Sequence, residues 1–326
     1  MRDLSPRYWL IACTILLAGH ALVIHELVRV GDGKTHVYIL DVDQGDSIFI
    51  VSPTGKQILV DGGPNLTALE HLGRLMPALD RSLDLVVLTH PDLDHLVAIP
   101  EVVERYRIGG IVLTGIAVSN PRYQRLLTEI EERHIPVLLA DPRADIDLGD
   151  GVLLDTVWPE AGLLGRTVKA PNDTSVVMRL FTGSQSILLT GDIEKDAEED
   201  ILRSGVDIRS TILKVAHHGS KTSSSTGFLL AVNPDRAVIS VGRDNSFGHP
   251  HPSVLERYRH FGIPVETTVE EGTIEIEMNP AGSPKTQSPN KAQKQNPNAQ
   301  DSNYSHIWAL GFVFWVFRMI YPSPSS

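Results

Sequence analysis

Cysteine is nearly absent from this 326-residue chain, which has a single copy at position 13. One cysteine excludes an intramolecular disulfide and a cysteine-based metal cluster. Any metal site must therefore use histidine and carboxylate ligands. The scarcity of cysteine does not indicate a compartment, because a disulfide-free chain suits reducing and oxidising environments alike.

An excess of positive charge is also lacking, since 29 Lys and Arg residues face 40 Asp and Glu residues and the formal net charge is −11. This acidic balance argues against indiscriminate binding of nucleic acid. It does not exclude a phosphodiester substrate, because cations and a few local basic side chains can neutralise a single site. The length and the hydrophobic content of 42% suit one large α/β domain.

The beginning of the chain carries an apolar run that suggests a membrane. Residues 8–24 are almost wholly apolar, and Arg2 and Arg7 precede them. We interpret residues 1–30 as a signal anchor or a cleavable signal peptide, with a buried first helix as the alternative. Retention of the basic flank in the cytoplasm would place the following domain outside the cytoplasm.

The end of the chain differs in composition from its middle. Residues 280–305 contain no Ile, Leu, Val or Phe and predict a disordered polar linker. Residues 306–326 are rich in Trp, Phe and Ile and predict a membrane-associating segment. The topology at this end is open, because three lysines in the linker conflict with its placement outside.

Residues 31–279 read as one domain whose two halves share a plan, a strand meander followed by alternating helices and strands. Predicted strands lie at 36–42, 46–51, 57–60, 84–89, 111–114, 136–140, 152–158, 175–181, 186–190, 211–216, 235–241 and 273–278. Predicted helices lie at 66–79, 95–106, 121–133 and 194–204. A further element is predicted at 253–261, and residues 141–151 read as polar turns. The repeated plan predicts a two-sheet sandwich with outer helices and a site at strand ends.

The strand at 84–89 leads into the run His90-Pro91-Asp92-Leu93-Asp94-His95, which holds four potential metal ligands in six residues. Two imidazoles and two carboxylates in one turn can converge on one or two divalent ions. The structural alternative is a polar loop in which Asp92 or Asp94 merely caps the next helix. The density of ligands favours the metal site.

Other candidate ligands also follow apolar strands. Asp192 comes directly after the strand at 186–190 and can bridge two metals, although an aspartate there can equally cap a helix. His217 and His218 follow the strand at 211–216 as ligands or proton donors. His249 lies in a loop after the strand at 235–241 and is a further ligand or acid candidate. This placement favours a metal-dependent hydrolase.

A hydrolase built on these residues needs an activated water, a proton for the leaving group and positive charge near the substrate. Paired cations held by carboxylates and imidazoles would lower the pKa of a bridging water toward neutrality. We expect His217 or His218 to donate the proton. Lys221 or Lys214 would contribute positive charge near an anionic substrate.

Several segments in order carry a family resemblance: Leu40-Asp41-Val42-Asp43-Gln44-Gly45-Asp46-Ser47, Val60-Asp61-Gly62-Gly63, 89–95, Asn172-Asp173-Thr174-Ser175, Thr190-Gly191-Asp192 and 215–221. Over residues 36–278 the chain resembles the metallo-β-lactamase superfamily, and within it the hydrolase domain of ComEC-like DNA-internalisation competence proteins. The resemblance implies a four-layer αββα sandwich, one or two divalent ions such as zinc or manganese, and degradation of a DNA strand during uptake.

The resemblance also implies roles for individual residues. The implied metal ligands are His90, Asp92, Asp94, His95 and Asp192. His218 and His249 are further ligand candidates, and His217 and His218 are candidates for proton transfer, in no settled order. Asp94 and Lys221 are also predicted to be catalytic, and Asn172 and Ser220 to contact the substrate.

The chain departs from the family pattern at a few positions, which leaves alternatives open. Asp43 replaces a usual glycine, Leu96-Val97-Ala98 replaces Ile-Gly-Gly, and no histidine stands near Asn172. A looser loop, a more weakly held metal and reduced activity are expected from these changes. The first hypothesis is a membrane-attached phosphodiesterase acting on single-stranded DNA or another phosphodiester. The alternatives are hydrolysis of another ester, thioester or lactam, and a non-catalytic binding or assembly module.

Overall fold

The computed structural model describes residues 7, 10–17, 19, 32–149, 151–160 and 162–279. Residues 10–17 are helical. Within these described ranges, no helix combines the length and the apolar character needed to cross a membrane. Most of the predicted segment 1–30, and the predicted segments 280–305 and 306–326, lie outside the described residues.

The first sheet has seven strands, and its order combines a meander with parallel strands. Neighbours in space run β16 (Ile274–Met278), β1 (Thr35–Ile39), β2 (Ile48–Val51), β3 (Gln57–Val60), β5 (Leu85–Val87), β7 (Ile111–Leu113) and β8 (Val137–Leu139). The pairs from β16 to β3 are antiparallel, and those from β3 to β8 are parallel. Parallel pairing aligns the carboxyl ends of β3, β5 and β7 at one edge.

The second sheet repeats this plan. Its order is β15 (Val265–Thr267), β14 (Arg236–Ile239), β13 (Ile212–Lys214), β12 (Gln185–Leu189), β11 (Val177–Thr182), β10 (Val152–Trp158) and β9 (Asp145–Gly149). The strands β9 to β12 are antiparallel neighbours, and β12 to β15 are parallel. The carboxyl ends of β12, β13 and β14 therefore also share one edge.

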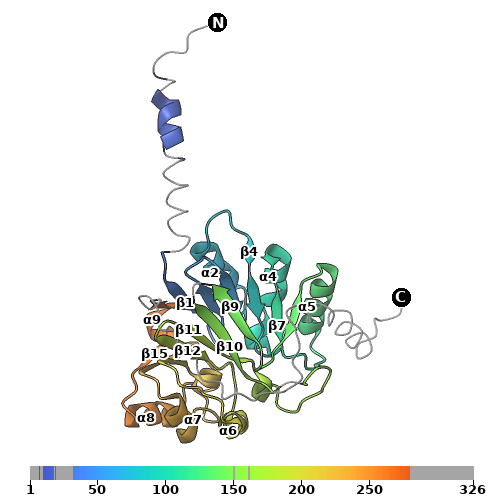
Figure 1. Cartoon of the computed structure of the whole chain (residues 1–326), viewed down its shortest axis with the longest axis vertical. Helices are drawn as coiled ribbons and strands as arrows, with labels where there is room; N and C mark the ends of the chain where they lie inside the picture. The colour runs from blue at the N-terminus through green and yellow to red at the C-terminus, as the bar shows by residue number, and fades with distance from the viewer. Residues whose placement is uncertain are drawn as a thin grey trace, which may run out of the picture.

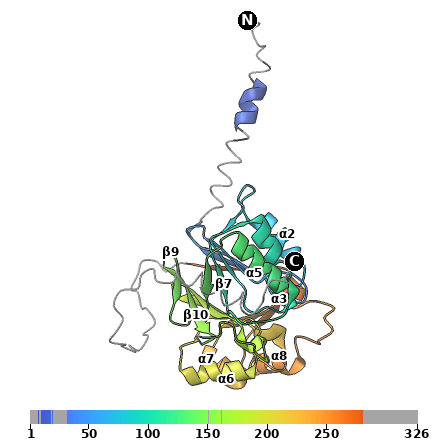
Figure 2. The ribbon, with the colours of Figure 1, turned by 90° about the vertical axis from the view of Figure 1, so that its right-hand side faces the viewer.

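Helices cover the outer face of each sheet (Figures 1 and 2). The first sheet carries α2 (Thr67–Leu75), α3 (Leu93–Leu96), α4 (Ile99–Arg105) and α5 (Pro121–Glu132), and the second carries α6 (Lys195–Ser204), α7 (Thr226–Val232) and α8 (Pro252–His260). Short α9 (Thr268–Glu271) precedes β16. Three apolar clusters lie between the sheets and beneath each helical layer. The predicted four-layer αββα sandwich is confirmed.

Two local predictions are wrong for identifiable reasons. Residues 141–151 were expected to be polar turns, but they contain β9, whose alternating acidic residues suit an exposed edge strand paired with β10. The helix expected at 95–106 is divided into α3 and α4. The division occurs because Val97 N donates to Gly63 O at 3.1 Å, so this amide is engaged by another loop.

Candidate metal centre

The loop after β5 brings the clustered ligands to the carboxyl-end edge of the first sheet. Asp92 directly precedes α3, and Asp94 and His95 lie within that short helix. Neighbouring loops hold the backbone, because Asp46 N donates to Asp94 O at 3.2 Å and Gly62 N donates to His95 O at 2.6 Å. A Cβ atom at Gly45 would overlap the carbonyl oxygen of Asp94, so this close approach requires glycine.

Asp43, which replaces the family's usual glycine, adopts a φ of 73°. This is the left-handed region, which glycine enters at no steric cost and which aspartate tolerates better than most other residues. The loop between β1 and β2 therefore keeps a conformation suited to glycine despite the replacement.

The imidazole of His95 contacts the buried carboxylate of Asp61 through Nδ1, the nitrogen that points away from the other ligands. Its Nδ1 lies 2.8 Å from Asp61 Oδ2, and Asp61 also accepts hydrogen bonds from Thr89 N at 2.8 Å and Thr89 Oγ1 at 2.7 Å. This contact fixes the orientation of the ring and directs Nε2 toward Asp192 Oδ2, 3.3 Å away. Asp61 therefore positions His95 as a ligand.

The second sheet supplies the other side of the site. Asp192 follows β12, and His217 and His218 lie in the turn after β13, where both have left-handed φ angles. His218 Nδ1 lies 2.9 Å from Ser240 O, with which a protonated Nδ1 makes a hydrogen bond. Its Nε2 then faces Asp192 Oδ2 at 3.3 Å and Asp94 Oδ2 at 3.4 Å.

Four side chains, hereafter the four-ligand group, therefore meet: Asp94, His95, Asp192 and His218. One ligand atom from each lies within 4.8 Å of all the others. His95 Nε2, His218 Nε2 and Asp192 Oδ1 are buried and make no hydrogen bond. Buried polar atoms without partners are costly, and two imidazoles with two carboxylates are a suitable donor set for a divalent cation. These residues fit a metal ion.

The carboxylates and imidazoles of the four-ligand group shift one another's pKa values. Burial alone would raise the pKa of Asp192, but His218 and His95 outweigh it and hold that pKa well below its usual value. Burial alone would lower the pKa of His95 and of His218, but their carboxylate neighbours hold both well above the usual range. A metal ion bound by these four side chains would therefore compete with protons for the two imidazoles.

His90 and Asp92 extend the site to one side. His90 Nε2 is buried without a hydrogen-bond partner and lies 3.9 Å from Asp92 Oδ2, while the His90 and His95 ring centroids are 4.1 Å apart. Burial and nearby His95 lower the pKa of His90 to about 3, so its imidazole is neutral at pH 7. A neutral imidazole beside a carboxylate is a donor pair that would help to hold a second ion.

His217 and His249 line the adjoining rim. His217 Nε2 lies 3.9 Å from Asp192 Oδ2, and its Nδ1 lies 3.1 Å from Glu194 Oε1. The His249 ring is 5.6 Å from that of His217 and stacks on Phe247 at 5.7 Å. Burial, together with His217 and His218, lowers the pKa of His249 to about 4. His217 thus adjoins Asp192, His249 adjoins His217, and neither imidazole belongs to the four-ligand group.

The other predicted residues, Lys221, Ser220 and Asn172, do not belong to the four-ligand group. Lys221 is exposed. The hydroxyl of Ser220 is 2.9 Å from that of Thr222, which closes a local turn. Asn172 begins a short 3-10 turn at Asn172–Thr174, and within the described chain its side chain makes no hydrogen bond to the four-ligand group. Ser175, three residues later, places its hydroxyl 3.3 Å from His90 Nδ1 and accepts from Asp192 N at 3.1 Å.

Sequence reasoning did not anticipate the buried ion pair between Lys214 and Asp46. Lys214 is fully buried at the end of β13, where its Nζ contacts Asp46 Oδ2 and lies 3.4 Å from Gly191 O. Asp46 Oδ1 is 3.4 Å from His218 Nδ1. The charge of Lys214 is thus directed at Asp46 rather than at a substrate. A lysine within an apolar strand was the signal in the sequence.

Metal binding should raise the melting temperature of the protein by about 5–10 °C. A ligand at 100 times its Kd stabilises the folded state by about 2.7 kcal/mol, and about 2–4 °C accompanies each kcal/mol in a domain of this size. Differential scanning fluorimetry with manganese, zinc or EDTA measures the shift. Asp94→Ala should remove it, while Glu277→Gln, in the exposed group of His36, Glu275 and Glu277, should retain it. The opposite pattern would place the metal in that exposed group.

The sandwich and its ligands define a class of protein. The family model described as Metallo-beta-lactamase superfamily matches residues 40–243, which contain the whole four-ligand group. The chain belongs to the metallo-β-lactamase superfamily, and the resemblance seen in its motifs is confirmed. This fold binds one or two metal ions, and its members are generally metal-dependent hydrolases.

Within this superfamily, the chain is related to competence proteins. ComE operon protein 3 of Bacillus subtilis is 29% identical over 282 residues, covering 81% of this chain and 35% of the relative. Competence protein ComA of Neisseria gonorrhoeae is 31% identical over 286 residues, covering 86% and 37%. The chain thus spans just over a third of the length of these relatives. The crystal structure of the metallo-β-lactamase fold protein YhfI from Bacillus subtilis aligns with a TM-score of 0.49 at 14% identity. The alignment covers 74% of this chain and 99% of YhfI.

Proposed function

We propose that this chain is a metal-dependent phosphodiesterase whose substrate is a nucleic acid, with single-stranded DNA as the first candidate. The convergence of Asp94, His95, Asp192 and His218 on one position carries this proposal. Relatives named for competence support a nucleic-acid substrate. The metal is proposed to be zinc or manganese, because His and carboxylate ligands suit both.

When bound, one or two divalent ions would supply Lewis-acid chemistry and neutralise the charge on an attacked phosphoryl group. The residues of the chain would orient the reaction and move the proton. His217, next to Glu194 and 3.9 Å from Asp192, lies on the rim where a leaving oxygen needs a proton. The neighbouring His249, whose pKa is lowered to about 4, is neutral at pH 7 and adds no charge to this rim.

Hydrolysis of three substrates tests this proposal. The full chain, with manganese or zinc, should cleave single-stranded DNA, and Asp94→Ala should lose that cleavage. Double-stranded DNA and a generic phosphodiester establish the specificity of the reaction. If the chain binds metal tightly and cuts none of the three, the phosphodiesterase proposal is wrong, and another ester-type substrate or a binding role becomes the better account.

We also propose that the chain is attached to the membrane with the domain outside the cytoplasm. The apolar character of residues 8–24 and the basic residues before them support this placement. The residues described as helical in this segment include Leu10, Ile15 and Leu17, whose side chains are exposed. Exposed leucine and isoleucine on one short helix are typical of a segment that contacts lipid.

A further inference from the structure

Both ends of the domain leave from the same side, opposite the metal centre. Thr35 at the start of β1 pairs with Met278 at the end of β16. Because β1 to β3 form an antiparallel meander, β1 runs in the same direction as β3 and β5. Thr35 and Met278 therefore lie at the edge where β5 begins, whereas His90 follows its other end. Any membrane segment before or after the domain would be joined at this edge.

The surface at this edge has one apolar and three basic side chains, hereafter the basic end: Leu79, Arg81, Arg105 and Arg107. Two short parallel strands, β4 (Ser82–Leu83) and β6 (Arg107–Ile108), lie just ahead of β5 and β7 and bring these residues together. The loop before β4 projects from the domain beside the start of β1 in Figures 1 and 2. Leu79 in this loop is 97% exposed.

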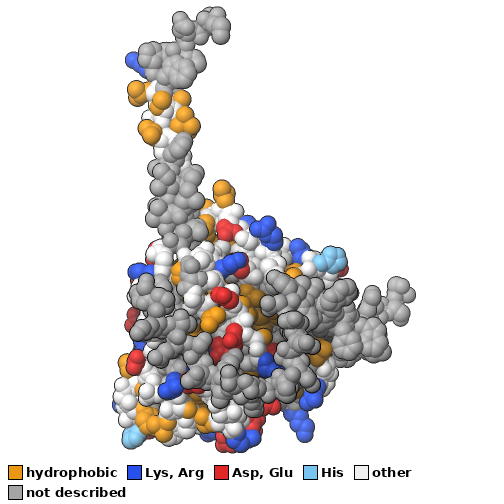
Figure 3. Space-filling model, viewed as in Figure 1, with side chains coloured by type: hydrophobic (Ala, Val, Ile, Leu, Met, Phe, Trp, Pro, Cys, Tyr) orange, Lys and Arg blue, Asp and Glu red, His pale blue; other side chains and the backbone are white. Residues whose placement is uncertain are grey.

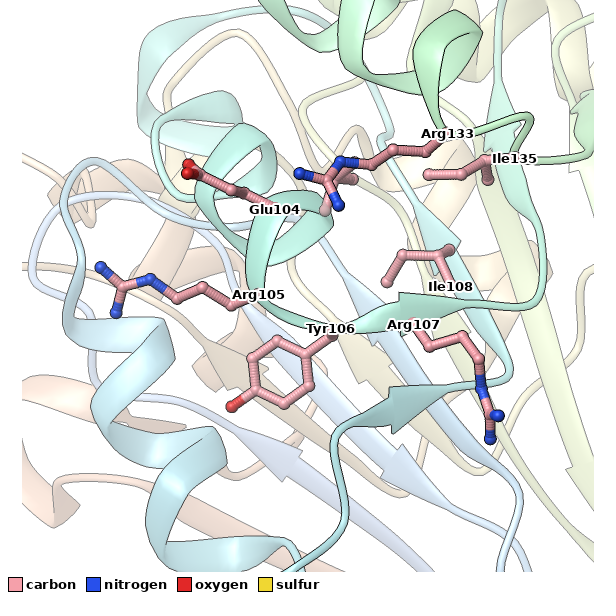
Figure 4. Close-up of a pocket in the computed structure, with 8 residues that line it drawn as sticks. Glu104, Arg105, Tyr106, Arg107, Ile108, Arg133 and Ile135 are labelled. Atoms are coloured by element: carbon pink, nitrogen blue, oxygen red, sulfur yellow. The ribbon is translucent and has the colours of Figure 1, made fainter.

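The arginines of the basic end have no carboxylate partner. Among the described residues, no carboxylate oxygen lies within 4.0 Å of Arg81, Arg105 or Arg107. Arg81 Nη1 donates to Asp80 O at 2.8 Å, and its guanidinium lies 6.0 Å from the Tyr106 ring centroid. Figure 4 shows Arg105 and Arg107 on either side of Tyr106. Three exposed cations without a carboxylate partner therefore lie close together on this edge, although the whole chain has a net charge of −11.

Three carboxylates on the elements around these arginines are engaged by other partners. Glu104 pairs with Arg125 at 3.0 Å, and Glu129 pairs with Arg133 at 2.8 Å. The carboxylate of Asp80 accepts hydrogen bonds from Ser82 and Gln57. Lys and Arg side chains are visible beside the loop before β4 in the space-filling view (Figure 3). The basic end thus presents free positive charge next to an exposed apolar side chain.

We propose that the basic end rests on an anionic phospholipid surface, with Leu79 among the headgroups and the metal centre facing away from the membrane. This inference rests on the membrane attachment proposed above. Arg105 occupies the last turn of α4, where a cation also complements the helix dipole. Arg81 and Arg107 lie outside helices, so that explanation does not apply to them. An anionic phospholipid surface attracts basic side chains that lie close to it by electrostatic interaction.

Site-directed labelling of the full chain tests this orientation. Cys13→Ser removes the natural thiol, and Leu79→Cys or Ser119→Cys then provides one site for a fluorophore. Ser119 is an exposed matched control, because it follows β7 at the opposite edge. The labelled chain is reconstituted in phosphatidylcholine vesicles with or without phosphatidylglycerol, and headgroup-bound nitroxides quench fluorophores near the surface. Flotation of the vesicles measures attachment separately.

We expect stronger quenching at position 79 than at 119, only with phosphatidylglycerol and at low salt. The triple variant Arg81→Gln, Arg105→Gln and Arg107→Gln should reduce the quenching at 79 to the level at 119. Each arginine contributes a factor of about five near an anionic surface, so the docking equilibrium should fall about 100-fold. Metal-dependent activity of this variant should be unchanged.

Three outcomes would overturn the inference. Equal quenching at 79 and 119 would mean that the domain moves freely on its tether. Quenching at 79 that survives the triple substitution would mean that the arginines do not dock the domain. Failure of the full chain to float with vesicles would overturn both membrane attachment and docking, while the hydrolase proposal would be judged by activity in the same samples.

Discussion

Replacing Asp192 by Asn should lower kcat/KM for metal-dependent hydrolysis by about 10³-fold or more, because a metal site supplies several kcal/mol of transition-state stabilisation. One oxygen of Asp192 lies 3.3 Å from both His95 Nε2 and His218 Nε2, and the other is buried without a partner. Its carboxylate is thus the common neighbour of the imidazoles. Asparagine keeps the shape and removes the charge that a cation requires.

The matched control for Asp192→Asn is Asp196→Asn, an exposed carboxylate in the first turn of α6. It should leave both activity and metal affinity unchanged. Isothermal titration with manganese or zinc and steady-state hydrolysis measure the two effects, and circular dichroism checks that each variant is folded. Full metal affinity and activity in folded Asp192→Asn would show that the ion is bound elsewhere.

Replacing Lys214 by Met should destabilise the domain by about 3–5 kcal/mol, because it leaves a buried carboxylate without its partner. Asp46 and Lys214 are both nearly inaccessible to solvent, and they join the loop after β1 to the end of β13. Burial alone would raise the pKa of Asp46, but Lys214 and His218 outweigh it and hold that pKa below its usual value. Without Lys214, the charge on Asp46 loses its main compensation.

The matched control for Lys214→Met is Lys56→Met, which removes an exposed ion pair with Asp84 and should cost about 0–1 kcal/mol. Urea unfolding monitored by circular dichroism gives both values. The double variant Lys214→Met with Asp46→Leu should recover much of the stability, since neither partner of this ion pair then leaves an uncompensated buried charge. Equal destabilisation by Lys214→Met and Lys56→Met would contradict a structural role for the buried pair.

Much of the fold could be predicted because each half of the chain shows regular apolar periodicity. The strand β3 (Gln57–Val60) has the predicted bounds, and the site lies at strand ends. The small sheet of β4 and β6 was not predicted, since its two-residue strands are too short to carry a periodic pattern. The helix α7 (Thr226–Val232) was also missed, because its apolar residues follow a Ser- and Thr-rich stretch typical of a loop.

The sequence by itself determined the kind of chemistry. The run from His90 to His95 places four ligands in six residues, and the single cysteine excludes a thiolate site. Ligand type and local density can be read from neighbouring residues, because a short loop cannot separate them widely. The family motifs followed from the same local information.

Only the tertiary structure decided which atoms meet. Asp192 and His218 reach Asp94 and His95 because the two sheets pack face to face, and Lys214 pairs with Asp46 across 168 residues of chain. Strand pairing likewise decided that both ends of the domain lie opposite the metal centre. Such contacts depend on how side chains of both sheets fill one core. No local pattern in the sequence shows which distant residues will lie close together.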